Sequence, residues 1–249
     1  MFENSDFVLI LATLPSRENG LIQELDKSDA AVVYLNPIED NLMVDYTTID
    51  SRYECGSEEG VLAILAKGLL FEKEIPVHVK SFFENLDEGY ISAECNVGEE
   101  EVEEIVNIRK LSKKPFIFVG DDIKNHPREE NIKKIVSLLV ELDGFESNLK
   151  PVDFSDLEDV EELDSFDGTI IYKCNALDKS EENKLLGSQQ FAIAAKIKDG
   201  DSIKIKAKNE YSRLFSVEKS LKGTIALLPG ARSDESYSYE LARIVKEDV

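Results

Sequence analysis

The chain has 249 residues, of which 42% are hydrophobic, and its 29 basic residues against 51 acidic ones give a formal net charge of −22. This composition is that of a globular protein with enough apolar sequence for one large core or two smaller ones. The charge argues against nucleic-acid binding and against docking on anionic membranes, because both of these partners are negatively charged themselves.

The N-terminal segment predicts a cytoplasmic protein. The sequence "MFENSDFVLILATLPS" carries acidic residues before its apolar run, where a secretory signal carries basic ones. The sequence also has no stretch of eighteen apolar residues, the length that a membrane span requires. We therefore expect neither secretion nor membrane insertion.

The first half of the chain alternates short apolar runs with amphipathic stretches, the pattern of an α/β layer with a parallel sheet. In the helix predicted at 56–70, Ser57 is a candidate N-cap, and Glu58 and Glu59 suit the positive end of the helix dipole. Gly144 is a candidate stop for the last helix of this half. The predicted strands are 6–13, 30–36 and 115–122, and the predicted helices are 20–27, 56–70 and 128–144, with further helical sequence up to residue 114.

The second half has a different periodicity. After Pro151 the chain becomes strongly acidic, and we predict an exposed acidic connector at 151–167 between an α/β domain at 1–150 and a β domain at 168–249. Short strands separated by turn residues indicate a compact β barrel or sandwich. The predicted strands are 169–174, 190–197, 201–208, 211–218 and 223–229, and a short closing helix is predicted at 238–248.

The segment "IKDGDSIKIKAK" (197–208) has two aspartates around a glycine, which raises the possibility of a metal loop. A calcium loop needs more converging oxygen ligands than this segment offers. Asp-Gly is instead a strong turn signal, and the alternation of isoleucine and lysine after it is typical of a half-buried strand. We interpret the segment as a turn and a strand of the β domain.

The common catalytic and ligand-binding motifs are missing. The cysteines Cys55, Cys95 and Cys174 form no C-x-x-C pair, and His78 and His126 are isolated in sequence. Neither a G-x-G-x-x-G fingerprint, a P-loop, a G-x-S-x-G elbow nor an H-E-x-x-H helix occurs. The sequence therefore predicts no catalytic residue and no metal ligand.

Ligands of open α/β sheets bind at the carboxyl ends of the strands, which makes the loops "TLPSREN", "NPIED" and "GDDIKNHP" candidate ligand sites. In the third loop, Gly120, Asp121, Asp122 and His126 resemble a metal site in composition. The favoured interpretation is a tight turn at Gly120 followed by solvated or helix-capping acids. Two of the loops are net acidic, and a diphosphate would find only Arg17, Lys124 and Arg128 nearby.

Five segments, taken in order, resemble the molybdopterin-oxidoreductase superfamily. They are "YECGSEEGVLAILAKGLL", "KPFIFVGDDIKNHPREENIKKIVSLL", "DGTIIYKCNALD", "GSQQFAIAAKIKDGDSIKIKAK" and "SLKGTIALLPG". Within the superfamily, the chain is most similar to the C-terminal part of the large iron–sulfur subunit of bacterial NADH-quinone oxidoreductase, respiratory complex I. The resemblance covers about residues 6 to 230.

The resemblance implies a Rossmann-like parallel-sheet domain followed by a smaller double-psi β-barrel-like domain. It also implies a structural part of the peripheral arm of complex I, whose other subunits are the expected partners, on the cytoplasmic side of the bacterial inner membrane. The iron–sulfur clusters of the family lie in an N-terminal region with no counterpart here, so we expect a fragment or excised domain. Ala12 stands where cofactor-binding relatives usually have glycine, and no molybdenum ligand is identifiable.

An alternative assigns the chain to the C-terminal, cofactor-nucleotide-binding part of a formate-dehydrogenase-like molybdenum oxidoreductase. A third possibility is a free-standing acidic interaction domain. In the second alternative, the dinucleotide site would be lined by Asn36, Pro37, Gly120, Asp121, Asn175, Ser188 and Gln189. We favour the first interpretation, in which these residues are vestigial and the chain binds no cofactor.

Overall fold

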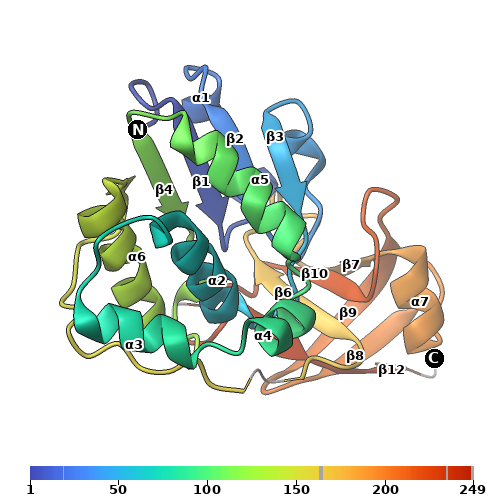
Figure 1. Cartoon of the computed structure of the whole chain (residues 1–249). Coiled ribbons are helices and arrows are strands. Elements are labelled where there is room, and N and C mark those ends of the chain that lie inside the picture. The colour runs from blue at the N-terminus through green and yellow to red at the C-terminus, as the bar shows by residue number, and fades with distance from the viewer. Residues whose placement is uncertain (19, 163–164, 234, 248–249) are drawn as a thin grey trace. The chain divides into compact units, whose positions relative to one another are not determined.

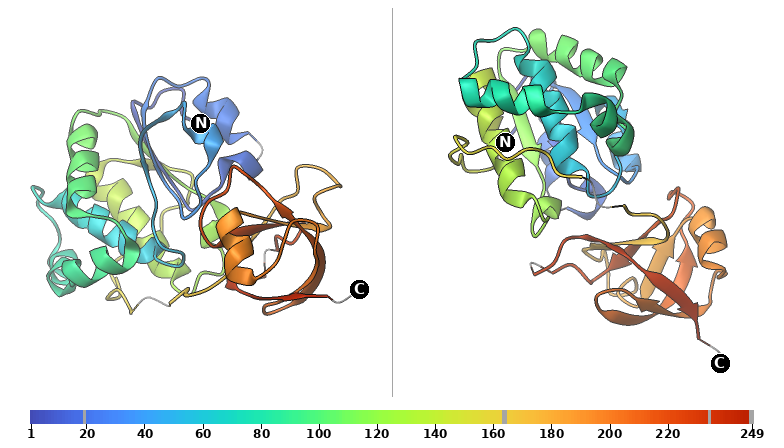
Figure 2. Two further views of the ribbon diagram at one scale, coloured as in Figure 1. Left: turned by 90° about the vertical axis from the view of Figure 1, so that its right-hand side faces the viewer. Right: turned by 60° about the horizontal axis from the view of Figure 1, so that its bottom comes forward.

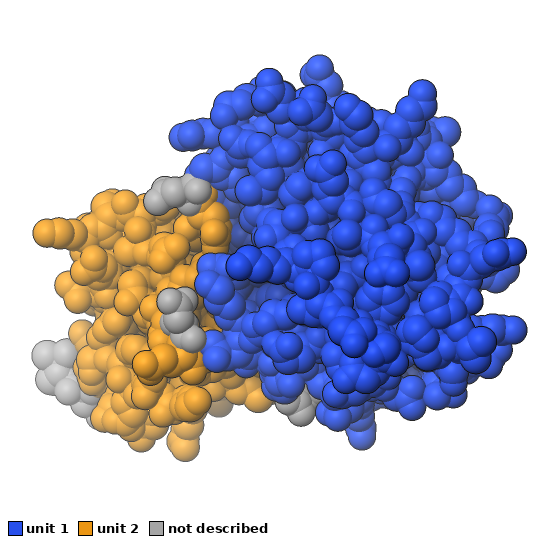
Figure 3. Space-filling model, turned by 90° about the vertical axis from the view of Figure 1, so that its left-hand side faces the viewer, with its two compact units in different colours: residues 1–15, 19–37, 42–164 blue, residues 16–18, 38–41, 165–249 orange. Residues whose placement is uncertain are grey.

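The computed structural model of the chain describes residues 1–18, 20–162, 165–233 and 235–247. Residue 19 of the first predicted loop, residues 163–164 of the predicted connector and residue 248 of the predicted tail lie outside the described residues. The chain divides into two compact units, which are coloured separately in Figure 3. Unit 1 comprises residues 1–15, 19–37 and 42–164, and unit 2 comprises residues 16–18, 38–41 and 165–249.

Unit 1 is built on a five-stranded sheet in which every pairing is parallel (Figure 1). The sequence prediction of a parallel sheet is therefore confirmed, with strands at each of the three predicted places. The strand β3 was not predicted, because Ile49 is its one buried apolar residue and it lies at an edge of the sheet. In spatial order the strands are β3 (Thr47–Ser51), β2 (Ala31–Leu35), β1 (Phe7–Leu11), β4 (Pro115–Val119) and β5 (Glu146–Ser147).

Helices cover both faces of this sheet, because alternate residues of β1 point to opposite sides. Leu9 belongs to a large core with residues of α2 and α6, whereas Val8 and Ile10 belong to a second core with Leu21 of α1. Among the described residues, no helix combines the length and the apolar character needed to cross a bilayer. The helices of unit 1 are α1 (Leu21–Leu25), α2 (Glu58–Leu70), α3 (Val77–Asn85), α4 (Glu88–Cys95), α5 (Glu99–Lys110) and α6 (Glu129–Asp143).

The predicted helix ends are confirmed in position but only partly in chemistry. Gly144 follows α6 with φ 74°, the left-handed conformation that glycine adopts most easily. Ser57 stands at the N-cap of α2, yet its hydroxyl donates to the Glu54 carbonyl oxygen at 2.6 Å and does not cap the helix. Glu58 and Glu59 are buried, so the expected solvent-exposed dipole interaction is not their main role.

Unit 2 is a curled sheet of seven strands with mixed pairing, seen along its curl in the left view of Figure 2. The pairs β6–β10 and β7–β9 are parallel and the other pairs are antiparallel. The two outer strands, β11 and β12, are separated in sequence by Ala242 alone, so one continuous segment pairs with both ends of the sheet. In spatial order the strands are β11 (Tyr239–Leu241), β6 (Ile170–Cys174), β10 (Ile225–Pro229), β7 (Lys184–Gly187), β9 (Glu210–Val217), β8 (Ser202–Lys206) and β12 (Arg243–Lys246).

Two predictions for unit 2 were wrong. The predicted strand at 190–197 is the helix α7 (Gln189–Ala195), which Ser188 caps by accepting a hydrogen bond from the Phe191 amide at 2.9 Å. The predicted closing helix at 238–248 is instead the pair of strands β11 and β12. In both places a short apolar pattern fits either period, and tertiary pairing decides the outcome.

The segment 197–208 is a turn and a strand, as the sequence predicted. Gly200 has φ 83°, and its amide donates to the Phe215 carbonyl oxygen at 2.9 Å. In β8, Ile203 and Ile205 are fully buried, and Lys206 is exposed. The strand lies between β9 and β12, so its lysines do not guard an edge of the sheet.

Candidate functional site

A buried polar cluster lies where the strands β3 and β4 end, at the carboxyl edge of the parallel sheet. Glu58 and Asp122 are completely buried, and His126 is 6% exposed. Tyr53 and Cys55 from the segment after β3 are buried beside them. This edge is where the fold class places ligands, so the cluster is the first candidate for chemistry.

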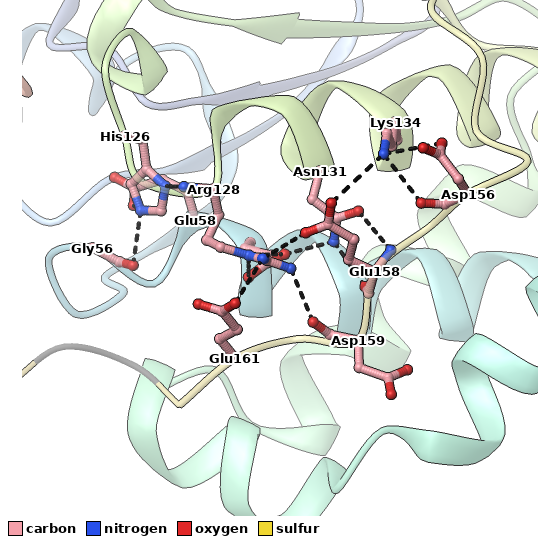
Figure 4. Close-up of polar contacts among 11 residues, drawn as sticks. Gly56, Glu58, His126, Arg128, Asn131, Lys134, Asp156, Glu158, Asp159 and Glu161 are labelled. Carbon is pink, nitrogen blue, oxygen red and sulfur yellow. Dashed lines mark hydrogen bonds and ion pairs between the residues drawn. The ribbon is translucent and has the colours of Figure 1, made fainter.

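Both ring nitrogens of His126 are engaged within unit 1. The Arg128 amide donates to Nδ1 at 3.0 Å, so Nδ1 is the unprotonated nitrogen. Nε2 then carries the proton and faces the Gly56 carbonyl oxygen at 3.1 Å (Figure 4), with Glu58 Oε2 at 3.4 Å. The ring ties the loop before α2 to the loop before α6, and Nδ1 is not free to act as a base.

The neighbours of Glu58 are held in their protonated forms. The Tyr53 hydroxyl donates to Glu58 Oε1 at 3.3 Å. Burial first, and then the Glu58 charge, raise the pKa of Tyr53 and the pKa of Cys55 well above their ordinary values. A cysteine nucleophile needs a lowered pKa, so Cys55 is a structural thiol in this setting.

Glu59 and Arg128 form a buried ion pair next to this cluster. Arg128 Nε lies 3.0 Å from Glu59 Oε1, and Asn131 Nδ2 donates to the same oxygen at 2.6 Å. Burial raises the pKa of Glu59 despite these two partners. The carboxylate is therefore strongly dependent on Arg128 and Asn131 for its charge to be tolerated.

The same side chains hold the acidic segment after α6 against unit 1 (Figure 4). Arg128 Nη1 contacts Glu158 at 2.7 Å and Glu161 at 3.0 Å. Asn131 bonds the Glu158 backbone in both directions, accepting from its amide at 3.0 Å and donating to its carbonyl oxygen at 2.9 Å. The acids of this segment are mostly exposed, but its backbone is fixed by specific partners.

The predicted site residues of unit 1 occupy the ends of β2 and β4. Asn36 is buried and its amide donates to the Ser51 carbonyl oxygen at 3.3 Å, and Pro37 follows it. Gly120 is packed so closely that an added Cβ would lie 2.2 Å from the Ala12 carbonyl oxygen. Asp121 is exposed and paired with Lys124 at 2.9 Å.

Asp122 corrects the interpretation of the loop after β4. We expected its acids to be solvated or to cap the next helix, but the Asp122 side chain is completely buried. Its amide donates to the Ala12 carbonyl oxygen at 3.2 Å, which draws the loop toward the end of β1. In the described part of the chain, no three or more His, Cys, Asp or Glu side chains are grouped as a metal ion requires.

The predicted site residues of unit 2 have structural partners. Ser188 caps α7 and its hydroxyl donates to the Gly223 carbonyl oxygen at 2.6 Å. Gln189 is the exposed first residue of α7. Asn175 Nδ2 donates to the carbonyl oxygen of Arg17, a residue of the same unit, at 3.3 Å.

The three basic residues that a phosphate ligand would need are each held by carboxylates. Lys124 pairs with Asp121, Arg128 pairs with Glu59, and Arg17 pairs with Glu181 at 2.5 Å. The carboxyl edge of unit 1 thus presents buried carboxylates and cations that are already paired. A diphosphate at this edge would be repelled and would have to displace those partners.

Sequence reasoning missed the pairing of the two glutamates with partners about seventy residues away. The available signal was local: two adjacent acids at the start of an otherwise apolar helix, in a chain where His126, Arg128 and Asn131 follow a buried strand. No known protein-family model and no curated protein matches the chain.

Proposed function

We propose that the chain is a non-catalytic structural module of the peripheral arm of bacterial NADH-quinone oxidoreductase, equivalent to the C-terminal part of its large iron–sulfur subunit. The parent complex transfers electrons from NADH to quinone, and its iron–sulfur clusters would lie in sequence outside this chain. The module would sit on the cytoplasmic side of the inner membrane and contact other subunits of the arm. The resemblance of the ordered segments motivates this assignment.

The carrying observation is that the carboxyl edge of the parallel sheet is filled by its own side chains. His126 uses both ring nitrogens, and Arg128 is bound to Glu59. The Cys55 thiol is buried, and its pKa is raised by burial and by Glu58. Groups that serve catalysis elsewhere are here bonded to one another, which supports a structural role.

The architecture also fits the proposed family. The strand order β3-β2-β1-β4-β5 with helices on both faces is typical of Rossmann-like domains. We assign the curled sheet of unit 2 to the double-psi β-barrel type, supported by its two parallel pairs and by the closing segment β11–β12. These features favour the superfamily without identifying a member of it.

The residues do not fit a pterin dinucleotide. Ala12, at the end of β1, has φ 54°, a conformation that costs a residue with a Cβ free energy, and its carbonyl oxygen is in contact with Gly120. The nearby carboxylates Glu58 and Asp122 oppose a phosphate group. In unit 2, Ser188 is committed to capping α7. We therefore derive no cofactor chemistry for this chain.

The proposal is tested by deleting the coding sequence in the source bacterium and restoring it from a plasmid. We expect deletion to lower the amount of assembled NADH-quinone oxidoreductase, measured by native electrophoresis with an NADH-oxidation stain. Plasmid complementation should restore it. Unchanged amounts of complex and unchanged NADH:quinone activity in membranes of the deletion strain would refute the proposal.

The molybdenum-enzyme alternative makes a different prediction for the purified chain. It requires micromolar or tighter binding of a guanine nucleotide in titration calorimetry, and pterin detectable by mass spectrometry. The buried carboxylates predict no measurable heat. Stoichiometric molybdenum or pterin would favour the alternative.

A further inference from the structure

An apolar groove with an acidic rim lies between α3, α4 and the segment 159–162 of unit 1. Its volume is about 290 Å³. Small-molecule sites usually have volumes of about 300–1,000 Å³, so this groove has room for one or two side chains and not for a large cofactor. Phe82, Leu86 and Ile91 line it and are almost completely buried, and Tyr90 adds an aromatic ring that is 39% exposed.

The rim of the groove is negatively charged. Of the described residues that line it, four are acidic and none is basic. Among the described residues, Asp87, Asp159 and Glu162 take part in no ion pair, whereas Glu161 is paired with Arg128. Asp87 accepts from the Tyr90 amide and Asp159 accepts from Asn85 Nδ2, so neutral donors orient two carboxylates without cancelling their charge.

The wall formed by the acidic segment is held in place from behind. Arg128 donates to the Asp159 carbonyl oxygen at 2.9 Å, and Asn131 bonds the backbone of Glu158. Lys134 contacts Asp156 at 3.0 Å. In Figure 4 the Asp159 carboxylate points away from Arg128, on the opposite side of the segment from the guanidinium. The rim is therefore preorganised, which reduces the entropy cost of binding.

We infer that this groove binds a basic segment of a partner protein, with the aliphatic stem of an arginine or lysine on the apolar floor and its cation among the rim carboxylates. A long basic side chain has this division between an apolar stem and a charged end. An arginine offers planar donors that suit carboxylates and an aromatic ring. The inference names only the chemistry of the occupant and does not rest on the proposed function.

A metal ion is a weaker occupant of the same groove. The carboxylates of the rim are spread along two helices and the segment, and no metal-binding group of three or more side chains occurs among the described residues. The apolar floor would also leave a bare cation without ligands on one side. Charge complementarity together with the apolar floor favours an organic cation with an apolar stem.

The test is fluorescence anisotropy with the full chain and a labelled nine-residue peptide that carries two arginines, each next to a leucine. A matched peptide replaces both arginines with citrulline, which keeps the size and removes the charge. We expect the arginine peptide to bind and the citrulline peptide to bind about tenfold more weakly, which corresponds to the loss of one charge-assisted interaction.

Matched variants localise the binding. The double variant Asp159→Asn/Glu162→Gln should raise the Kd of the arginine peptide about tenfold. The control Glu103→Gln/Glu104→Gln removes the same charge from exposed positions of α5 and should change Kd less than about twofold, as expected for screened charges. Amide exchange of α4 and of the segment 156–162 should slow when the peptide is bound.

Three results would overturn the inference. One is the absence of binding to the arginine peptide at low salt. Another is equal binding of the citrulline peptide, since the rim would then have no role. The third is an equal loss of affinity in the rim variant and in the α5 control, which would reveal a general effect of net charge and not a site.

Discussion

Two acidic regions of unit 1 use the same kind of side chain in opposite ways. At the carboxyl edge of the sheet, Glu58, Glu59 and Asp122 are buried. Glu58 and Glu59 are bound to His126 and Arg128, respectively. At the groove between α3 and α4, Asp87, Asp159 and Glu162 are exposed. The difference shows that the place where this fold class usually binds ligands is closed internally, while the unmatched charge faces outward from the helical layer.

Arg128 connects the two regions, because it pairs with Glu59 on one side and with Glu161 on the other. Arg128→Met should lower the free energy of unfolding by about 3 kcal/mol, measured by urea denaturation, because it leaves the Glu59 carboxylate buried without its cation. The double variant Glu59→Gln/Arg128→Met should recover much of that loss. A double variant that loses the full sum of the two single effects would show that the pair is not coupled.

Gly120 tests how tightly the carboxyl edge is closed. Gly120→Ala should destabilise unit 1 by about 2 kcal/mol, because the new Cβ would lie 2.2 Å from the backbone oxygen of Ala12 and one of the two segments must move. Gly89→Ala is the matched control, since its new Cβ meets no atom closer than 3.7 Å and alanine favours a helix. Thermal melting of both variants should separate them, and equal melting temperatures would mean that the edge is loosely packed.

Acid pH distinguishes the carboxylates by the sign of their pKa shifts. Burial opposes the charge of Asp6, but the Ser112 hydroxyl and the amides of Lys113 and Lys114 lower the pKa of Asp6 to about 2. The stability that Asp6 contributes is present above the ordinary pKa of 3.8 and is lost as pH falls toward 2. Glu59 has the opposite sign, because its raised pKa makes its ionised form oppose folding.

The variant Asp6→Asn isolates this contribution. Its free energy of unfolding should change less steeply between pH 4 and pH 2 than that of the wild-type chain, since one acid-sensitive carboxylate is gone. Parallel pH profiles of the two proteins would mean that Asp6 has no special stabilising bonds. Urea denaturation at each pH measures the difference.

The smallest effect is expected at the groove. Asp159→Asn/Glu162→Gln should change the free energy of unfolding by less than about 0.5 kcal/mol, because both side chains are exposed. Its reduced binding of the arginine peptide would then reflect a lost contact and not a damaged fold. A large loss of stability in this variant would place these acids in the structural network of Arg128 and would remove the contrast between the two regions.

The sequence predicts most of unit 1 because its strands and helices carry strong local patterns. The strands around Phe7, Ala31 and Pro115 are continuous apolar runs, and α6 has a clear apolar repeat with Gly144 at its end. The strand β3 is short and mostly polar, so its pairing with β2 supplies what its sequence lacks. In unit 2, the tail forms strands because two sheet edges are available to it, which no local pattern indicates.

The candidate site was harder to predict than the fold. Glu58 and Glu59 fit a simple helix-dipole interpretation, and only the fold brings them to His126 and Arg128. The expected turn at Gly120 is present, but the burial of Asp122 depends on the end of β1. The groove combines residues of α3 and α4 with a segment that follows α6, so its two sides are separated by about seventy residues.

The most direct test of the proposed function is the native mass at which the chain occurs in its source bacterium. An epitope-tagged copy at the natural locus is followed by native electrophoresis of gently solubilised membranes, with an NADH-oxidation stain on a parallel lane. We predict that the tagged chain co-migrates with the NADH-oxidising complex. Migration as a free species near its own mass of 28.0 kDa, with none in the complex, would contradict the account.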